Sequence, residues 1–362
     1  YTLDLNSVRK IMQSTQQKNR PKVRGWFARL LRYSVRCLLL LTFGVLSFDW
    51  YFGYSPLVYV TGINQTIRTV VSQHPPLLPT RVAWQGTLET EALNESSGLA
   101  SSRKNKGILW SLNDSGSPAE IFAFTETGKP HSTWPVAMQT PTDWEAMDVF
   151  NYANRSYLLL ADVGDNLAIR EKVTLTVVAE PDLNQPVTTL PVSWQVQVRY
   201  PDGPRDCEAV AVDTTSSPAR ILMMTKRIYP NELYEVPLLT ESTEIVVAKK
   251  IAEIEGINRS TSPDFAKYGG LAAFMGMPTG MDYQGGRLLV TTLKDAYLFE
   301  VSAPQKTLRR LLLPSKGQRE AIAFDAFNNQ RAFITEERAL GTRAAELFSV
   351  EFAESFAYPP ER

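Results

Sequence analysis

Three stretches of the sequence repeat one pattern, in which an acidic residue stands before a small residue and a run of alternating apolar positions. They are DWEAMDVF at 143–150, DCEAVAVD at 206–213 and REAIAFD at 319–325. Carboxylates hold hard divalent cations and act as general acids or bases in hydrolysis, so the recurrence indicates one shared acidic site. The pattern or a variant of it starts at five places, namely Glu95, Glu145, Glu208, Gly280 and Glu320.

Each of these five segments is predicted to be a short β-strand, because its apolar residues alternate with a period of two. A turn and a more apolar strand follow each one, as in GILWSLND at 107–114, and a third strand comes next, as in EIFAFTE at 120–126. Four of the five units add a fourth strand, which is clear in SWQVQVRYP at 193–201 and in EIVVAKKIAEI at 244–254. The fifth unit ends without one.

Repeated four-stranded units of this size predict an all-β propeller of five blades over residues 81–362. A strand at 81–93 precedes the first unit, and it can close the ring by pairing with the last blade. A sixth blade would have to come from the insertion at 255–279, which shows no convincing alternation. A β-sandwich is the alternative fold.

In a propeller blade, the residue that opens the first strand lies beside the residue that closes the second strand. The pattern therefore gathers acidic side chains at one mouth of the central channel.

Crowded carboxylates repel one another, and Lys226, Lys294 or a bound cation would offset that repulsion. Oxygen-rich loops such as LNDSGS at 112–117 and DVGDN at 162–166 suit Ca²⁺ or Mg²⁺. The expected metal ligands are Glu95, Asp114, Asp143, Glu145, Asp162, Asp165, Asp206, Glu208, Asp282 and Glu320. The alternative is that these residues only build tight turns and blade ends.

The N-terminal part has a different composition. Residues 1–32 form a basic tail, and residues 33–60 are apolar and long enough to predict one transmembrane helix. A cleaved signal peptide and an apolar core helix are the alternatives. Basic flanks stay in the cytoplasm, so we expect an inner-membrane protein with a cytoplasmic N-terminus, a linker at 61–80 and a periplasmic propeller.

The overall composition excludes several functional classes. The chain has 38 basic and 38 acidic residues, and this zero net charge argues against a nucleic-acid partner. Its two cysteines and two histidines argue against a disulfide framework, a zinc cluster and a Ser-His-Asp triad.

The order of ESSGLAS, LWSLNDSG, DWEAMDV, LLLADVGDN, DCEAVAVD and REAIAFD resembles that of bacterial extracytoplasmic propellers distantly similar to esterase-like phytase domains. The resemblance covers roughly residues 90–340. It implies channel carboxylates that hold Ca²⁺ and bind phosphate through the metal. The matching ligand and substrate positions are Glu95, Asp114, Asp143, Glu145, Asp162, Asp165, Asp206, Glu208 and Lys226. Such phytase propellers usually have six blades, and this chain has no run of basic residues for a highly phosphorylated substrate.

Two functions fit these features. In the first, the chain is a binding or assembly subunit of a larger membrane complex, with lipid contacts through 33–60 and protein partners at the propeller. In the second, it is a metal-dependent phosphoesterase-like enzyme or a glycoside hydrolase. The catalytic candidates would then be Glu145, Asp162, Glu208 and Lys226.

Overall fold

The computed structural model describes part of the chain, in two units with the bounds Tyr1–Val58 and Tyr59–Arg362. No helix in the described part is long and apolar enough to cross a membrane. The expected basic tail at 1–32 and most of the expected transmembrane segment at 33–60 lie outside the described residues, so both stay predictions. The described residues are 33–40 and 42, which are helical, and then 70–71, 74–238, 244–257, 260–269, 272–314, 319–337 and 345–352.

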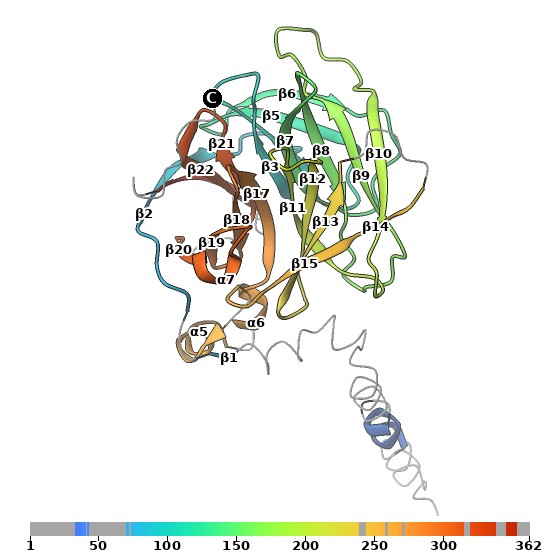
Figure 1. Ribbon diagram of the computed structural model, residues 1–362, viewed down its shortest axis with the longest axis vertical. Helices are drawn as coiled ribbons and strands as arrows, with labels where there is room; N and C mark the ends of the chain where they lie inside the picture. The colour runs from blue at the N-terminus through green and yellow to red at the C-terminus, as the bar shows by residue number, and fades with distance from the viewer. Residues whose placement is uncertain are drawn as a thin grey trace, which may run out of the picture. The chain divides into compact units, whose positions relative to one another are not determined.

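Five β-sheets in the second unit form a five-bladed propeller, which confirms the fold expected from the repeats (Figure 1). Blade 1 consists of β3 (Ser96–Ser101), β4 (Ile108–Asn113), β5 (Glu120–Thr125) and β6 (Pro130–Pro135). Blade 2 consists of β7 (Trp144–Tyr152), β8 (Arg155–Asp162), β9 (Val173–Ala179), β10 (Val192–Arg199) and β14 (Val246–Val247). Blade 3 consists of β11 (Cys207–Asp213), β12 (Arg220–Thr225), β13 (Asn231–Pro237) and β15 (Lys249–Ile254). Blade 4 consists of β17 (Pro278–Gln284), β18 (Arg287–Thr292), β19 (Asp295–Glu300) and β20 (Arg309–Leu312), with the short helix α7 (Pro304–Thr307) before β20. Blade 5 consists of β21 (Arg319–Asp325), β22 (Asn328–Glu336), β23 (Glu346–Phe352) and β2 (Thr80–Thr87).

The inner strands β3, β7, β11, β17 and β21 encircle one axis, because each contacts the next and β21 contacts β3. Strand β2 closes the ring as expected. It pairs antiparallel with β23, so the last blade takes its outer strand from the other end of the domain. Closure of this kind leaves no long unpaired edge between the first blade and the last.

The hydrophobic core consists of five clusters, one between each pair of neighbouring blades. In β7, for example, Ala146 packs toward blade 3, whereas the next residue, Met147, packs toward blade 1. Successive side chains of a strand point to opposite faces, and here both faces are buried. This explains why the inner strands are apolar at nearly every position.

Two sequence segments fold differently from the expected pattern. The segment 244–254 was predicted to be one strand, but it splits into β14, which pairs parallel with β10 of blade 2, and β15, which completes blade 3. The insertion at 255–279 makes no sixth blade. It contains β16 (Ser260–Thr261), α5 (Ser262–Tyr268) and α6 (Ala272–Met275) before β17 begins.

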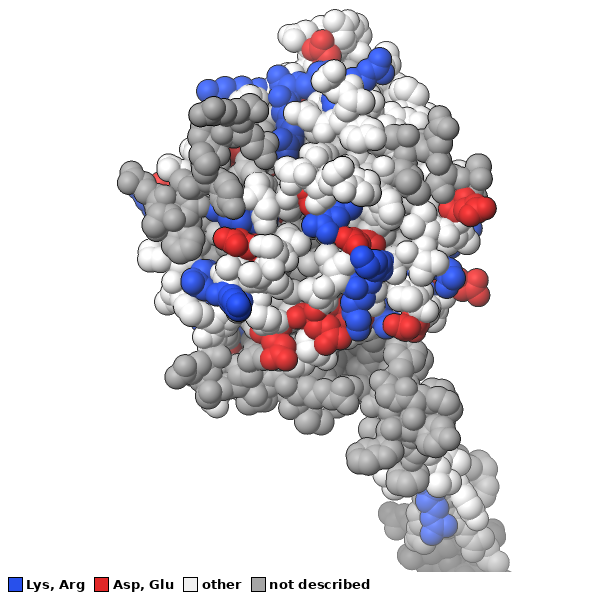
Figure 2. Space-filling model, in the orientation of Figure 1, with Lys and Arg blue, Asp and Glu red and all other residues white. Residues whose placement is uncertain are grey.

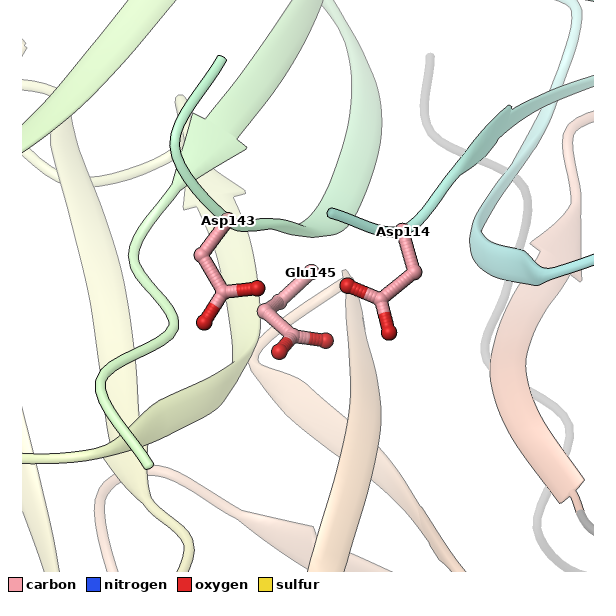
Figure 3. Close-up of side chains that lie close together, drawn as sticks. All are labelled: Asp114, Asp143 and Glu145. Atoms are coloured by element: carbon pink, nitrogen blue, oxygen red, sulfur yellow. The ribbon is translucent and has the colours of Figure 1, made fainter. Parts of the chain in front are cut away.

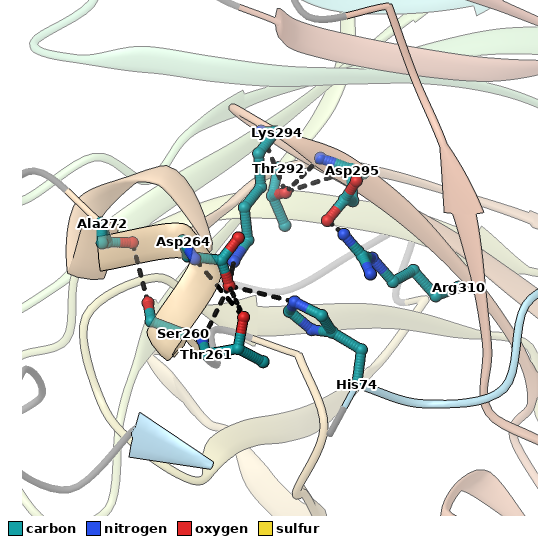
Figure 4. Close-up of polar contacts among 9 residues, drawn as sticks. All are labelled: His74, Ser260, Thr261, Asp264, Ala272, Thr292, Lys294, Asp295 and Arg310. Atoms are coloured by element: carbon teal, nitrogen blue, oxygen red, sulfur yellow. Dashed lines mark hydrogen bonds and ion pairs between the residues drawn. The ribbon is translucent and has the colours of Figure 1, made fainter. Parts of the chain in front are cut away.

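The end of the expected linker docks against this insertion and against blade 4. Strand β1 (Val70–Val71) pairs parallel with β16, and the Leu78 N–H donates to the Arg310 carbonyl at 2.8 Å. A polar network joins the three parts (Figure 4). The Asp264 Oδ2 atom accepts hydrogen bonds from the Thr261 N–H at 2.7 Å and from Lys294 Nζ at 3.1 Å, and it lies 3.0 Å from His74 Nε2. Lys294 was expected to offset the acidic mouth, but it lies in this network instead.

Candidate functional site

Every inner strand carries a β-bulge directly after its first residue. In β3 the pairing register shifts between Ser96 and Gly98, and in β7 it shifts between Trp144 and Ala146. The same shift recurs in the other three inner strands. A bulge leaves one residue unpaired and changes the direction of its side chain. The five bulged residues are Ser97, Glu145, Glu208, Thr279 and Glu320.

The bulged side chains face one another across the ring. The Ser97 hydroxyl donates to Glu145 Oε2 at 3.0 Å. Burial, and then the charge of Glu208, raise the pKa of Glu145 and that of Glu320, as expected for three glutamates around one space. The acid of the repeated sequence pattern is therefore the residue that a bulge turns toward the channel in three of the five blades.

Steric crowding between neighbouring inner strands explains why the residue after the bulge is small. At this point the backbones of neighbouring inner strands come close together. A Cβ on Gly98 would lie 2.6 Å from the Met147 backbone nitrogen, and a Cβ on Gly280 would lie 2.8 Å from the Glu320 carbonyl oxygen. The residue after the bulge is small in every blade: Gly98, Ala146, Ala209, Gly280 and Ala321.

Three carboxylates from two neighbouring blades converge at the mouth. Asp114 follows β4 of blade 1, whereas Asp143 and Glu145 stand at the start of β7 in blade 2. One oxygen from each lies within 4.8 Å of the others, and Figure 3 shows the side chains pointing toward one another. Glu145 is buried, and the two aspartates are partly exposed. This acidic triad has the oxygen ligands and the spacing to hold a metal ion.

Gly164 makes room for the triad. A Cβ at this position would lie 2.4 Å from Asp143 Oδ2 and 2.6 Å from Glu145 Oε1. Arg170 fixes the backbone here, because its Nη1 donates to the Gly164 carbonyl at 2.6 Å and its Nη2 pairs with Asp162 Oδ1 at 2.7 Å. Any larger residue at 164 would push the two carboxylates aside.

The triad is electrostatically strained without a cation. Burial, and then the charge of Asp114 and a hydrogen bond to it, raise the pKa of Asp143 to about 6. Burial, and then the charges of Glu208 and Asp114, raise the pKa of Glu145 well above its usual range. A divalent cation at this place would favour the ionised forms and lower both pKa values.

A buried ion pair lies beside the triad. Lys226 Nζ donates to Glu208 Oε1, and side-chain exposure is 17% for the lysine and 5% for the glutamate. Burial raises the pKa of Glu208 to about 7, although Lys226 acts in the opposite direction. Burial, and then the charge of Glu208, raise the pKa of Glu320 well above its usual range. The mouth thus combines a candidate metal centre with carboxyl groups whose pKa values are raised.

Three of the expected ligands serve the loops instead. Asp162 accepts the N–H groups of Thr142 and Asp143, each at 3.0 Å, in addition to its ion pair with Arg170. Asp165 accepts the N–H groups of Ile169 and Arg170 at 2.9 and 2.8 Å.

Asp206, the third of these ligands, pairs with Arg227 Nε at 2.6 Å and accepts the Asp165 N–H at 3.0 Å. These carboxylates already have backbone or guanidinium donors, so they hold the loops that carry the triad.

Asp282 lies in a different part of the channel. It hydrogen-bonds to Asp148, and both residues are buried. Asp148 accepts the Val212 N–H and Asp282 accepts the Phe324 N–H, both at 2.6 Å. Each aspartate therefore joins its own inner strand to the next blade. Asp148 was not anticipated from the sequence, although its place in EAMDV marks it as an acid on an inner strand.

Glu95 lies at the rim, where its charge contributes to the raised pKa of Glu337 after burial and Asp114. Glu337 was not anticipated either, because β22, the second strand of blade 5, ends at Glu336 and the residue after the strand is the one that interacts with the mouth. Lys226 has the same relation to β12, which ends at Thr225.

Comparisons with known proteins do not assign the chain to a family. No protein-family model and no curated protein matches the chain. Among solved structures it is similar to a luciferin-regenerating enzyme, with 11% identity and a TM-score of 0.44 over 76% of this chain and 96% of that one. It is also similar to the PQQ-bound aldose sugar dehydrogenase of Streptomyces coelicolor, with 12% identity and a TM-score of 0.43 over 76% of this chain and 100% of that one. Neither likeness transfers a substrate, a cofactor or a residue role. The resemblance to esterase-like phytase propellers stays a prediction.

Proposed function

We propose that the chain is a divalent-cation-dependent hydrolase of phosphoesters, with its active site at the acidic channel mouth. The observation that supports this most strongly is the convergence of Asp114, Asp143 and Glu145 within 4.8 Å. Three carboxylate ligands from loops and strand ends favour a hard cation, and Ca²⁺ is the one expected. Such a cation supplies charge neutralisation at a phosphoryl oxygen.

The chain's own residues supply the proton transfer. Glu208 is buried beside the triad, and its pKa of about 7 suits a general base that takes a proton from the attacking water. Burial alone would lower the pKa of Lys226, but the charges of Glu208, Asp206 and Glu145 raise it, so the lysine stays charged. A charged lysine orients Glu208 and attracts an anionic substrate.

Two substitutions distinguish Ca²⁺ binding from catalysis. Glu145→Gln is expected to weaken Ca²⁺ binding at least about tenfold, because it removes one charged ligand. Glu208→Gln is expected to keep Ca²⁺ binding and to lose turnover of p-nitrophenyl phosphate by about 10²-fold or more. The measurements are calorimetric titration of the purified chain with Ca²⁺ and a colorimetric rate assay.

Glu171→Gln is the matched control, because Glu171 is an exposed acid in the same loop as Arg170. It should change neither quantity. Absence of Ca²⁺ binding in the unsubstituted chain, or equal turnover in the chain with Glu208→Gln, would reject the proposed function.

A second candidate function is supported by an apolar loop beside the mouth. Leu167 and Ile169 are 53% and 66% exposed, next to the triad-supporting residues Asp165 and Arg170. Exposed apolar side chains at the rim of a polar site suit contact with another protein. This supports the proposal of an assembly subunit, anchored by 33–60 in the inner membrane with the propeller in the periplasm.

Extraction of the chain from native membranes with a mild detergent tests the second candidate function. The assembly function predicts that partners co-purify with the chain, that Leu167→Ser combined with Ile169→Ser removes them, and that Glu208→Gln does not. A chain that elutes alone from such membranes contradicts it. Reporter fusions at residue 60 and at the N-terminus test the expected orientation.

A further inference from the structure

A second cavity lies at the opposite end of blade 2 from the acidic mouth. Strand β7 begins at the mouth with Trp144 and ends at Tyr152, so its hairpin with β8 stands at the far end of the blade. A cavity of about 850 Å³ opens there, which falls within the usual size range of small-molecule sites. Its lining comes from this hairpin, from the loop between β3 and β4, and from the end of β9.

Cations dominate the lining. Arg103, Lys104 and Arg155 stand against one carboxylate, Glu180. Within the described residues, the Arg155 guanidinium has neither a hydrogen bond nor an ion pair. Lys104 Nζ donates to a neutral acceptor, the Glu180 carbonyl, at 3.1 Å. Within the described residues the Arg155 charge is therefore unbalanced, whereas Lys104 also interacts electrostatically with the exposed Asp182.

The single acid is already satisfied by neutral donors. Glu180 Oε1 accepts the Ser102 hydroxyl and the Trp110 Nε1–H, the latter at 3.0 Å, and Glu180 Oε2 accepts the Ser156 hydroxyl. Glu180 is buried, with 2% of its surface exposed. It holds the floor of the cavity together, and its one negative charge stands against three positive charges, so the lining keeps a net positive charge.

Arg103 connects the cavity to the channel. Its Nε donates to the Val149 carbonyl at 3.0 Å, and its charge lowers the pKa of Asp148 and of Asp282, both of which burial raises. Part of the Arg103 charge thus serves the channel. The charge of Arg155 stays available to a ligand, Lys104 adds a second cation beside it, and Asn151, Asn154 and Tyr152 add amide and phenol groups.

We propose that this cavity binds a small phosphate ester of about monosaccharide size. Guanidinium and ammonium groups match phosphate oxygens in charge and geometry, and the asparagines and the tyrosine suit the hydroxyl groups of the ester's polar body. The site lies at the other end of the blade from the triad and does not depend on the proposed hydrolase function.

Calorimetric titration of the full-length chain tests the proposal. The probes are glucose 6-phosphate, a free sugar phosphate, and glycerol 3-phosphate, the polar fragment of a phospholipid, with glucose as the neutral control. We expect at least one phosphate to bind and glucose not to bind. Stronger binding of glycerol 3-phosphate would identify a lipid headgroup as the source, and stronger binding of glucose 6-phosphate a soluble metabolite.

Arg155→Gln should weaken the phosphate affinity by about tenfold or more, since it removes a charge-assisted contact to the ligand and breaks no side-chain hydrogen bond or ion pair among the described residues. Lys106→Gln is the matched control, because Lys106 is an exposed cation in the same loop as Arg103 and does not line the cavity. It should leave the affinity unchanged. The proposal is overturned if neither phosphate binds, or if both variants weaken binding equally.

The hydrolase proposal and the phosphate-binding proposal can be rejected independently of each other. Glu145→Gln removes the triad's buried ligand and should leave phosphate binding at the second cavity intact. If Arg155→Gln abolishes phosphate binding while turnover of p-nitrophenyl phosphate persists, the cavity proposal stands on its own evidence.

Discussion

The position of single residues decides the chemistry of the channel mouth. Lys226 lies among carboxylates from three blades, and its ion pair with Glu208 neutralises one of them. Other acids accept backbone N–H groups, as Asp162 does, whereas the triad acids converge on one another. In the triad, burial and mutual repulsion outweigh the charges of Arg170 and Lys226. This division separates the acids that hold loops from those that face a ligand.

Gly164→Ala tests this separation directly. The three atoms nearest to the added Cβ lie at the ends of the Asp143 and Glu145 side chains. These can move, so the free energy of unfolding should change by less than about 1 kcal/mol. Ca²⁺ affinity should fall by about tenfold or more, because two ligands leave their positions. Calorimetric titration measures the affinity and urea denaturation measures the stability; unchanged affinity would show that the glycine has no part in the site.

At the scale of elements, the bulged inner strand is the unit that repeats. The bulge turns one side chain to the channel, and the small residue after it lets neighbouring strands approach. The two features occupy adjacent positions, which is why the sequence repeats them as one short pattern.

Gly98→Ala should have the opposite effects to Gly164→Ala. Its Cβ would lie 2.6 Å from the Met147 backbone nitrogen, and backbone in a closed ring cannot easily move. We expect the free energy of unfolding to fall by about 2–3 kcal/mol, as in other overpacked cores. The unfolding midpoint in urea measures this. If Gly98→Ala lowers the free energy of unfolding no more than Gly164→Ala does, the inner strands are not in close contact.

The repeats and the closing strand were predictable because strand alternation and turn residues are local signals. The pairing register of neighbouring strands was not predictable from the sequence. A regular antiparallel register would pair Glu145 with Asp162, whereas the structure pairs Trp144 with Asp162 and leaves Glu145 unpaired. A bulge depends on packing against neighbouring strands, which a single strand does not encode. The same limit hid Ser97 and Thr279, whose neutral side chains occupy the bulge in blades 1 and 4.

Long-range contacts account for the other differences. Nothing local marks Lys294 as a partner of Asp264, because the pairing depends on how the insertion folds against blade 4. Similarly, the splitting of 244–254 depends on β10 of blade 2, which offers a free edge to β14. The candidate acids were predictable by type, but their division between loops and site was not.

For the whole molecule, ring closure and charge balance determine stability. On the face that Figure 2 shows, acidic and basic side chains are interspersed, in keeping with the zero net charge. The described acids with raised pKa values gather instead in the channel.

Removal of β2 should open the ring. A chain that begins at Leu88 lacks the outer strand of blade 5 and exposes the edge of β23. We expect it to aggregate or to melt well below a chain that begins at Pro79, which retains β2, lacks the same linker contacts and serves as the control. Size-exclusion chromatography and thermal melts compare the two. Equal melting temperatures would show that the closing pair contributes nothing to the propeller's stability.

The pH dependence of stability follows from the raised pKa values. Burial raises the pKa of Asp143 to about 6 and that of Glu208 to about 7, so the folded chain holds more protons than the unfolded chain. The resulting stability is complete below the unfolded pKa values, near 4, and is lost as the pH rises through about 7. We expect the melting temperature without a cation to be higher at pH 5.5 than at pH 8.

Added Ca²⁺ should reverse this loss at pH 8, because binding to the folded state alone raises its stability. Differential scanning calorimetry with Ca²⁺, and with a chelator as the control, provides the comparison. A melting temperature that rises between pH 5.5 and pH 8 without a cation, and that ignores Ca²⁺, would contradict the electrostatic account of the mouth.

The most direct test of the central claim is a crystal structure of the full-length chain grown with Ca²⁺. The account predicts one strong density peak at the channel mouth, with oxygens of Asp114, Asp143 and Glu145 at about 2.3–2.6 Å from it. Three carboxylates that lie apart from one another, or that bond only to protein groups at saturating Ca²⁺, would contradict it.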